Sequence, residues 1–242
     1  MKFAVIGGTG LIGSQVVKSL NAAGHEAVPH SQSTGVDVIT GKGLDEAVAG
    51  ADVLVNLTNS PTFDKDSLAF FQTSMDNLLA AGRKGGIRHF VILSIVGVDK
   101  VPELDYYKAK ALQEDILAAG PIPYSIVRAT QFMEFMDATM SWTTDGDTVR
   151  LPPTPIQPIA AKDVADAVAE VAAGAPLGGI RNIGGPEVFT LDELGRITLS
   201  RKPDGRTVVT DPTAGMFAAV KGDVLTDKNA HLAPTRYADW LS

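Results

Sequence analysis

The chain contains no cysteine among its 242 residues. This absence excludes disulfide bonds, thiolate nucleophiles and thiolate metal ligands. Histidine, aspartate and glutamate form no cluster with the tight spacing of a metal site, so we predict no bound metal. A cytoplasmic location is the simplest interpretation of such a composition.

The chain also lacks a long hydrophobic run and an excess of positive charge. No segment approaches the roughly 20 apolar residues of a membrane span. The apolar run at the N-terminus is broken by glycines too early for a signal peptide. The net charge of −7 argues against nonspecific binding to nucleic acid. We therefore expect a small-molecule substrate and neither a nucleic-acid nor a membrane partner; the oligomeric state stays open.

What the sequence does contain is a regular alternation of short apolar runs and amphipathic stretches. The apolar runs predict strands near 2–7, 26–30, 52–57, 88–94 and 123–129. The amphipathic stretches predict helices near 11–23, 43–49, 64–83 and 105–119. A short extra strand is expected near 36–38. This alternation indicates an α/β fold of the Rossmann type, a doubly wound parallel sheet covered by helices on both faces.

The rhythm changes after Arg128. Residues 142–147 are polar and turn-rich, and Pro152, Pro153 and Pro155 force an extended path. Further on, the pattern predicts a helix at 162–173, a strand at 181–183, a helix at 191–199 and a strand at 207–210. We therefore predict a dinucleotide-binding core over 1–130 and a smaller substrate-binding lobe over 131–242, with the strand near 180–183 returning to the core.

The most informative segment is the glycine-rich turn between the first strand and the first helix. It fits both the G-x-G-x-x-G and the G-x-x-G-x-x-G spacing, and its residues are Gly7, Gly8, Thr9, Gly10, Leu11, Ile12 and Gly13. Glycines let the backbone turn sharply and approach a diphosphate, while the helix N-terminus favours an anion. Because a strand precedes the motif and a helix follows it, we predict a dinucleotide site here rather than a structural turn.

The end of the second strand indicates which cofactor is preferred. A carboxylate at this point would bind both ribose hydroxyls of NAD, and none is present. The segment instead offers hydrogen-bonding side chains for a 2′-phosphate, at Ser31, Gln32 and Ser33. NADP is therefore favoured and NAD stays possible.

Three further polar residues are candidates for cofactor contacts. Asp37 can accept a hydrogen bond from the adenine amino group, or it can serve only its own turn. Asn56 and Thr58 follow a strand at its carboxyl end, the edge where open α/β sheets bind ligands. Either these two contact the ribose or diphosphate, or they cap the turn before the next helix.

The candidate catalytic residues lie in the next strand and helix. Ser94 ends an apolar strand at the ligand-binding edge. Tyr106 and Lys110 are four residues apart and therefore share one helix face. A lysine cation near a phenol favours the phenolate and lowers its pKa from about 10, which suits proton transfer to a carbonyl. Tyr107 is a rival for the same role.

The substrate is expected beside the residues that follow the fifth strand. Gln131 and Phe132 begin a run with aromatic and thioether side chains, which suits an apolar or planar substrate. A core helix would show the same pattern. Trp142 and the proline-rich segment 152–158 form either a lid over this site or a connection between the lobes.

Taken together, these residues resemble the short-chain dehydrogenase/reductases, and within them the atypical NmrA-like branch. The resemblance covers nearly the whole chain and rests on segments 7–13, 94–97, 124–132 and 163–165 and on the Tyr106/Lys110 pair. It implies that Tyr106 is the general acid/base, that Lys110 binds the nicotinamide ribose and lowers the pKa of Tyr106, and that Ser94 polarises the substrate carbonyl.

The function that follows is an NADPH-dependent reductase that transfers hydride to a small carbonyl or a quinone. The separation of Ser94 and Tyr106, 12 residues, is shorter than is usual in the broader family. Some NmrA-like proteins are cofactor-sensing regulators, so a non-catalytic redox-sensing NAD(P)-binding regulator is the alternative. An isomerase or epimerase with a tightly held cofactor is a third possibility.

Overall fold

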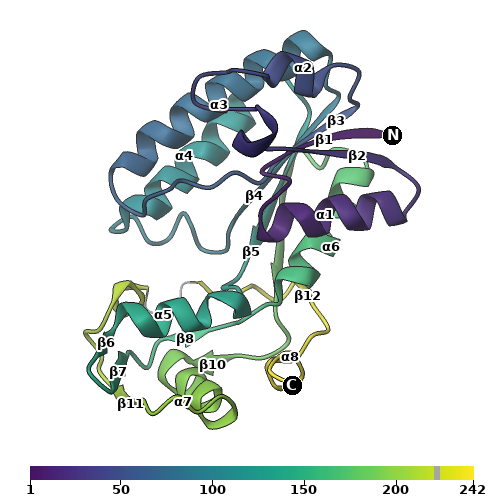
Figure 1. The fold of residues 1–242 in the computed structure, drawn as a ribbon. Helices are drawn as coiled ribbons and strands as arrows, with labels where there is room; N and C mark the ends of the chain where they lie inside the picture. The colour runs from purple at the N-terminus through teal and green to yellow at the C-terminus, as the bar shows by residue number, and fades with distance from the viewer. Residues whose placement is uncertain (221–223) are drawn as a thin grey trace.

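The computed structural model describes residues 1–220 and 224–242. A seven-stranded, entirely parallel sheet forms its centre, in the order β12-β9-β5-β4-β3-β1-β2 (Figure 1). In chain order the strands are β1 (Lys2–Ile6), β2 (Glu26–His30), β3 (Val53–Asn56), β4 (His89–Ile95), β5 (Tyr124–Ala129), β9 (Gly179–Gly184) and β12 (His231–Leu232). The strand order reverses at β1, so the carboxyl end of β1 is the switch point at which such sheets bind ligands.

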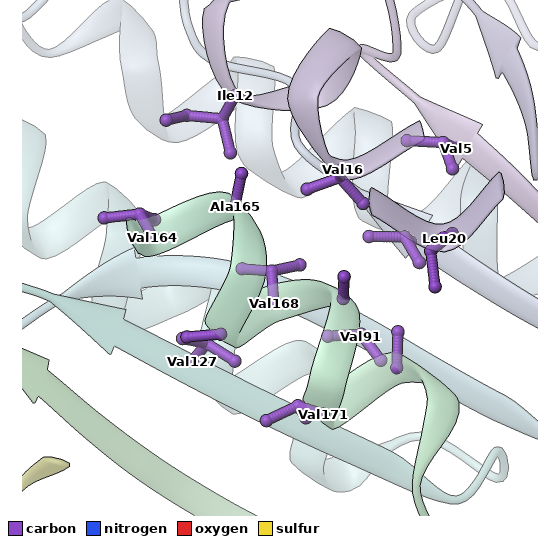
Figure 2. Packing of buried hydrophobic residues seen from close by; sticks show 14 of the residues in the cluster. Val5, Ile12, Val16, Leu20, Val91, Val127, Val164, Ala165, Val168 and Val171 are labelled. Atoms are coloured by element: carbon purple, nitrogen blue, oxygen red, sulfur yellow. The ribbon is translucent and has the colours of Figure 1, made fainter. Parts of the chain in front are cut away.

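Helices cover both faces of this sheet, and the predicted fold class is confirmed. On one face lie α1 (Leu11–Ala22) and α6 (Ala161–Ala173); on the other lie α3 (Asp66–Gly85) and α4 (Asp105–Ala119), with the short α2 (Leu44–Val48) beside α3 (Figure 1). Figure 2 shows how α1 and α6 face each other above the strands, with Val16 and Leu20 opposite Ala165 and Val168. These side chains are fully or almost fully buried.

A smaller lobe lies beyond the carboxyl ends of the strands (Figure 1). Its helices are α5 (Met136–Trp142), α7 (Leu191–Arg201) and α8 (Tyr237–Trp240), and its strands are β6 (Thr144–Asp145), β7 (Thr148–Leu151), β8 (Pro155–Ile156), β10 (Phe189–Thr190) and β11 (Thr207–Thr210). The chain returns from this lobe to the core twice. After β8, helix α6 packs on the central sheet and β9 pairs with β5; after α7 and β11, β12 extends the sheet beside β9. None of the helices among the described residues is long and apolar enough to cross a membrane.

The prediction of an extra strand at 36–38 is wrong. Val36 and Val38 are buried in the core beside α2 and α3, but the segment pairs with no strand within the described residues. Gly35 has a φ of 89°, and the Asp37 carboxylate accepts hydrogen bonds from the backbone N–H groups of Ile39 and Thr40. Apolar alternation here reflects burial of two side chains within a turn, not sheet pairing.

One ion-pair cluster ties α4 to the sheet. The Arg128 guanidinium on β5 donates to both carboxylate oxygens of Glu114 on α4, at 2.6 to 3.2 Å, and to Asp99 at 3.0 Å. The side chains of Arg128 and Glu114 are only 11% and 7% exposed. Because Glu114 lies one turn beyond Lys110, this pair holds the candidate catalytic helix against β5.

We expect Arg128→Met to lower the free energy of unfolding by about 3 kcal/mol, because it leaves the buried Glu114 carboxylate without a partner. The double variant Arg128→Met/Glu114→Leu, which removes both charges, should regain most of that loss. Urea denaturation followed by circular dichroism measures both changes. Equal stability of the single and double variants would contradict the role given to this pair.

Candidate functional site

The glycine-rich loop joins β1 to α1 at the switch point of the sheet. Gly7 has a φ of 78°, and the N–H groups of Gly7 and Gly8 donate to the carbonyl of His30 at the end of β2. A Cβ on Gly13 would lie 2.1 Å from the carbonyl oxygen of Gly7. The backbones of strand and helix therefore touch, as in a dinucleotide-binding turn.

Gly10 differs from the other glycines of the loop. It is the N-cap residue of α1 and makes no side-chain capping bond. A Cβ at Gly10 would meet only the Gly7 oxygen, at 3.4 Å, so the space in front of it is open. Thr9, Gly10 and Leu11 are exposed, while Gly8, Ile12 and Gly13 are buried. The loop thus presents the unpaired N–H groups of a helix start beside an open space, which suits a diphosphate.

The segment expected at the ribose 2′ position is accessible. Ser31 is partly buried, Gln32 and Ser33 are exposed, and the two serine hydroxyls are hydrogen-bonded at 2.8 Å. Burial lowers the pKa of His30, so its imidazole is neutral at neutral pH. Asp37 serves its own turn through Oδ1, and the bonds from Ile39 and Thr40 lower its pKa.

The loop after β3 satisfies its own polar groups and also holds Tyr106. The side-chain Oδ1 of Asn56 accepts from the backbone N–H and from the hydroxyl of Thr58, at 3.0 and 2.7 Å. The Tyr106 hydroxyl donates to Oδ1 of Asn59 at 2.5 Å. Sequence reasoning noted this loop but missed Asn59 as the partner of Tyr106, because a contact 47 residues apart has no local signal.

Tyr106 and Lys110 point to different partners. Lys110 Nζ donates to the carbonyl of Leu93 on β4 at 2.7 Å and to the Gln113 side chain, and it lies 4.9 Å from the centre of the Phe71 ring. Burial raises the pKa of Tyr106 to about 12, and burial lowers the pKa of Lys110 to about 7. The expected lowering of the Tyr106 pKa by Lys110 is therefore not found. A shared helix face does not make the two side-chain ends meet.

Tyr107, the rival of Tyr106, belongs to the core. It is 4% exposed and lies in an apolar cluster with Val98, Val101 and Val220. Burial raises its pKa above that of a free phenol. The geometry thus favours Tyr106, whose hydroxyl reaches the loop at the ligand-binding edge.

Two buried hydroxyls near the carboxyl ends of β4 and β5 have no hydrogen-bond partner within the described residues. They belong to Ser94, which is 4% exposed, and Thr130, which is 2% exposed. Ser94 lies opposite Arg128 in the register of β4 and β5, and Thr130 directly follows β5, two residues after Arg128. Buried hydroxyls are usually paired, so both suit a bound cofactor or substrate. Thr130 was not among the predicted site residues.

The two predicted substrate residues have structural contacts. The Gln131 side chain accepts from the backbone of Gln157 at 3.1 Å and donates to the Val224 carbonyl at 3.4 Å. Phe132 stacks on Phe135, with ring centres 5.4 Å apart. Gln131 thus joins loops of the small lobe, and a substrate contact by either residue stays a prediction.

This loop geometry, the doubly wound sheet and the polar groups at its carboxyl edge define a nucleotide-binding α/β protein. A match to the NAD(P)H-binding family spans residues 7–174, more than half of the chain. The chain therefore belongs to this family.

Solved structures share this fold at low sequence identity. The NADPH-dependent quinone oxidoreductase QOR2 from Escherichia coli, complexed with NADPH, is 18% identical with a TM-score of 0.77, over 100% of this chain and 98% of the other. The UDP-glucose 4-epimerase of Thermus thermophilus, complexed with NAD, is also 18% identical, with a TM-score of 0.74 over 93% and 90%.

Curated proteins also match over part of their length. The divinyl chlorophyllide a 8-vinyl-reductase of Cucumis sativus is 30% identical over 174 residues, which cover 59% of this chain and 41% of the reductase. The photosystem II assembly factor Ycf39 of Synechocystis is 27% identical over 151 residues, covering 55% and 46%. The chain spans less than half the length of these relatives.

Two alanine substitutions separate folding from cofactor binding. Gly10→Ala should leave the free energy of unfolding within about 1 kcal/mol, as for a Gly-to-Ala change without a clash, yet weaken NADPH binding at least about tenfold, because its methyl group enters the open space. Gly13→Ala should lower both the free energy of unfolding and the affinity for NADPH, because its Cβ would collide with the Gly7 carbonyl. Thermal denaturation and calorimetric titration measure the two effects. Unchanged NADPH affinity in Gly10→Ala would contradict this placement of the diphosphate.

The buried lysine makes stability depend on pH. Lys110 binds a proton below its ordinary pKa of 10.5 when unfolded but only below about 7 when folded. Between these values the unfolded state binds more protons, so the free energy of unfolding rises with pH, by up to about 1.4 kcal/mol per unit. Relative to Lys110→Met, the wild type should therefore gain stability across the window between the two pKa values. Parallel stability profiles of the two proteins would contradict the shift.

Proposed function

We propose that the protein is an NADPH-dependent reductase that transfers hydride to a small carbonyl or a quinone. The observation that carries this proposal is the open space at Gly10 on the same sheet edge as Tyr106 and the Ser94 hydroxyl, which has no hydrogen-bond partner among the described residues. One end of this edge suits a diphosphate, and the other offers groups that can orient and protonate a carbonyl.

The preference for NADPH rests on the end of β2. None of the three residues directly after His30 carries a carboxylate. Accessible hydrogen-bond donors for a 2′-phosphate are instead present, in the hydroxyls of Ser31 and Ser33 and the amide of Gln32. An acidic residue at this place would favour NADH and repel the phosphate. The QOR2 structure with NADPH supports this choice as an analogy of fold.

Tyr106 is the proposed proton donor. A bound nicotinamide nucleotide supplies hydride, and the reduced substrate oxygen then needs a proton. Burial raises the pKa of Tyr106 to about 12, so the phenol carries its proton at neutral pH but is a weaker acid than a free phenol, and proton donation depends on its position at the sheet edge. Ser94 donates a hydrogen bond to the substrate oxygen and orients it. Lys110 supports the carboxyl end of β4 through the Leu93 carbonyl and would hold the nicotinamide ribose of a bound cofactor.

The names of the similar proteins favour reduction of conjugated substrates. One is a quinone oxidoreductase and one is a vinyl-reductase. The regulator stays the second candidate, and the separation of Lys110 from Tyr106 favours it, because a phenol without a nearby cation is a weaker acid.

The test combines purified protein, NADPH or NADH, and a panel of quinones and aldehydes, with NADPH oxidation followed by absorbance. We expect turnover with NADPH and weaker activity with NADH. Tyr106→Phe should lower kcat for aldehydes about 100-fold and leave the affinity for NADPH unchanged, because the phenol only donates the proton. Quinone reduction should fall less, since it depends less on a protein acid.

Tight NADPH binding without turnover of any substrate would instead support the regulator. A clear preference for NADH would contradict the assignment of the ribose segment. Loss of NADPH affinity in Tyr106→Phe would show that the phenol binds cofactor and would remove its role as a proton donor.

A further inference from the structure

A row of aromatic rings connects the small lobe to Tyr106. Trp142 ends α5, and its ring centre lies 6.1 Å from that of Phe63 in the loop between β3 and α3. Phe63 in turn lies 4.9 Å from Tyr106, which lies 6.3 Å from Phe71 under Lys110. The two lobes therefore meet through aromatic rings at the candidate proton donor.

The outer two rings of this row are unusually exposed. Phe63 is 53% exposed and Trp142 is 57% exposed, whereas Tyr106 is 9% exposed and Phe71 is fully buried. Exposed aromatic rings that touch each other beside a reactive group resemble a binding surface more than a core, because a bound ring would bury both of their faces.

The backbone around Phe63 is held by hydrogen bonds within its own loop. The Ser67 hydroxyl donates to the Thr62 carbonyl at 2.7 Å, and the Asp64 carboxylate accepts from the backbone of Asp66 at 3.0 Å. Trp142 also lines a pocket of about 60 Å³ in the small lobe. The fixed loop therefore holds the exposed Phe63 ring beside Trp142 and Tyr106.

We propose that Phe63 and Trp142 form an aromatic clamp whose adjoining, exposed ring faces hold a planar conjugated ring beside Tyr106. This inference rests on the proposed function and names its substrate class: planar conjugated carbonyls such as quinones, in preference to saturated ketones. The selectivity arises because a flat ring can stack on both aromatic faces, whereas a puckered saturated ring cannot.

The test compares 1,4-naphthoquinone with the saturated bicyclic ketone 2-decalone. We expect Phe63→Leu and Trp142→Leu to raise KM for naphthoquinone about tenfold, since each removes one stacking contact. The inhibition constant of 2-decalone should change less than about twofold, because it gains no stacking. Phe63→Tyr and Trp142→Phe retain a ring and should keep wild-type values. NADPH affinity, measured by calorimetry, should stay constant in all four.

A second readout needs no turnover. In protein saturated with oxidised NADP, naphthoquinone should quench tryptophan fluorescence. Phe63→Leu should raise the dissociation constant for naphthoquinone about tenfold, the factor expected for KM. Leu177→Ala provides the surface control, because Leu177 is exposed at the amino-terminal edge of the sheet, away from the site. Thermal denaturation verifies that each variant is folded.

The outcomes separate this inference from the proposed function. Suppose the wild type reduces naphthoquinone. If the leucine variants then leave KM for naphthoquinone unchanged, or raise it by the same factor as the inhibition constant of 2-decalone, the clamp is wrong and the reductase stands. If the wild type binds NADPH but neither binds nor reduces naphthoquinone, the quinone reductase fails and the clamp fails with it.

Discussion

The close contact between the end of β1 and the first turn of α1 is the constraint on which the rest of the site depends. A side chain at Gly13 would collide with the Gly7 carbonyl, so this approach requires glycine. The same approach aims the start of α1 at the switch point of the sheet, where its unpaired N–H groups face the open space at Gly10. The position of a diphosphate then sets where the nicotinamide end must reach, towards β4 and β5.

Burial governs the chemistry at that far end. Tyr106 and Lys110 lie on one helix, yet desolvation raises the pKa of the phenol and lowers that of the ammonium, so it favours the neutral form of each. The Tyr106 phenol therefore keeps its proton at neutral pH. The Arg128–Glu114 pair keeps this helix fixed to β5, so the geometry of the edge also depends on a buried ion pair outside the candidate catalytic residues.

Much of the fold could be predicted from local pattern. The strands β1 to β5, the glycine-rich turn and the strand β9 follow from apolar runs and glycine spacing, because both signals are local. The partners of Tyr106 and Lys110 could not be predicted, since Asn59 and Leu93 come from other segments. The strand predicted at 36–38 was wrong for a related reason. Val36 and Val38 are buried by helices and not by a neighbouring strand.

The most direct measurement of the central claim is a titration of ¹⁵N-labelled protein with NADPH, followed by backbone amide NMR. We predict that the amide signals of Thr9 and Leu11 shift most at the glycine-rich loop, because their N–H groups would bind the diphosphate, whereas the N–H of Gly10 already donates to the Gly7 carbonyl. If millimolar NADPH and NADH leave these signals unchanged, the loop is only a structural turn and the assigned site is wrong.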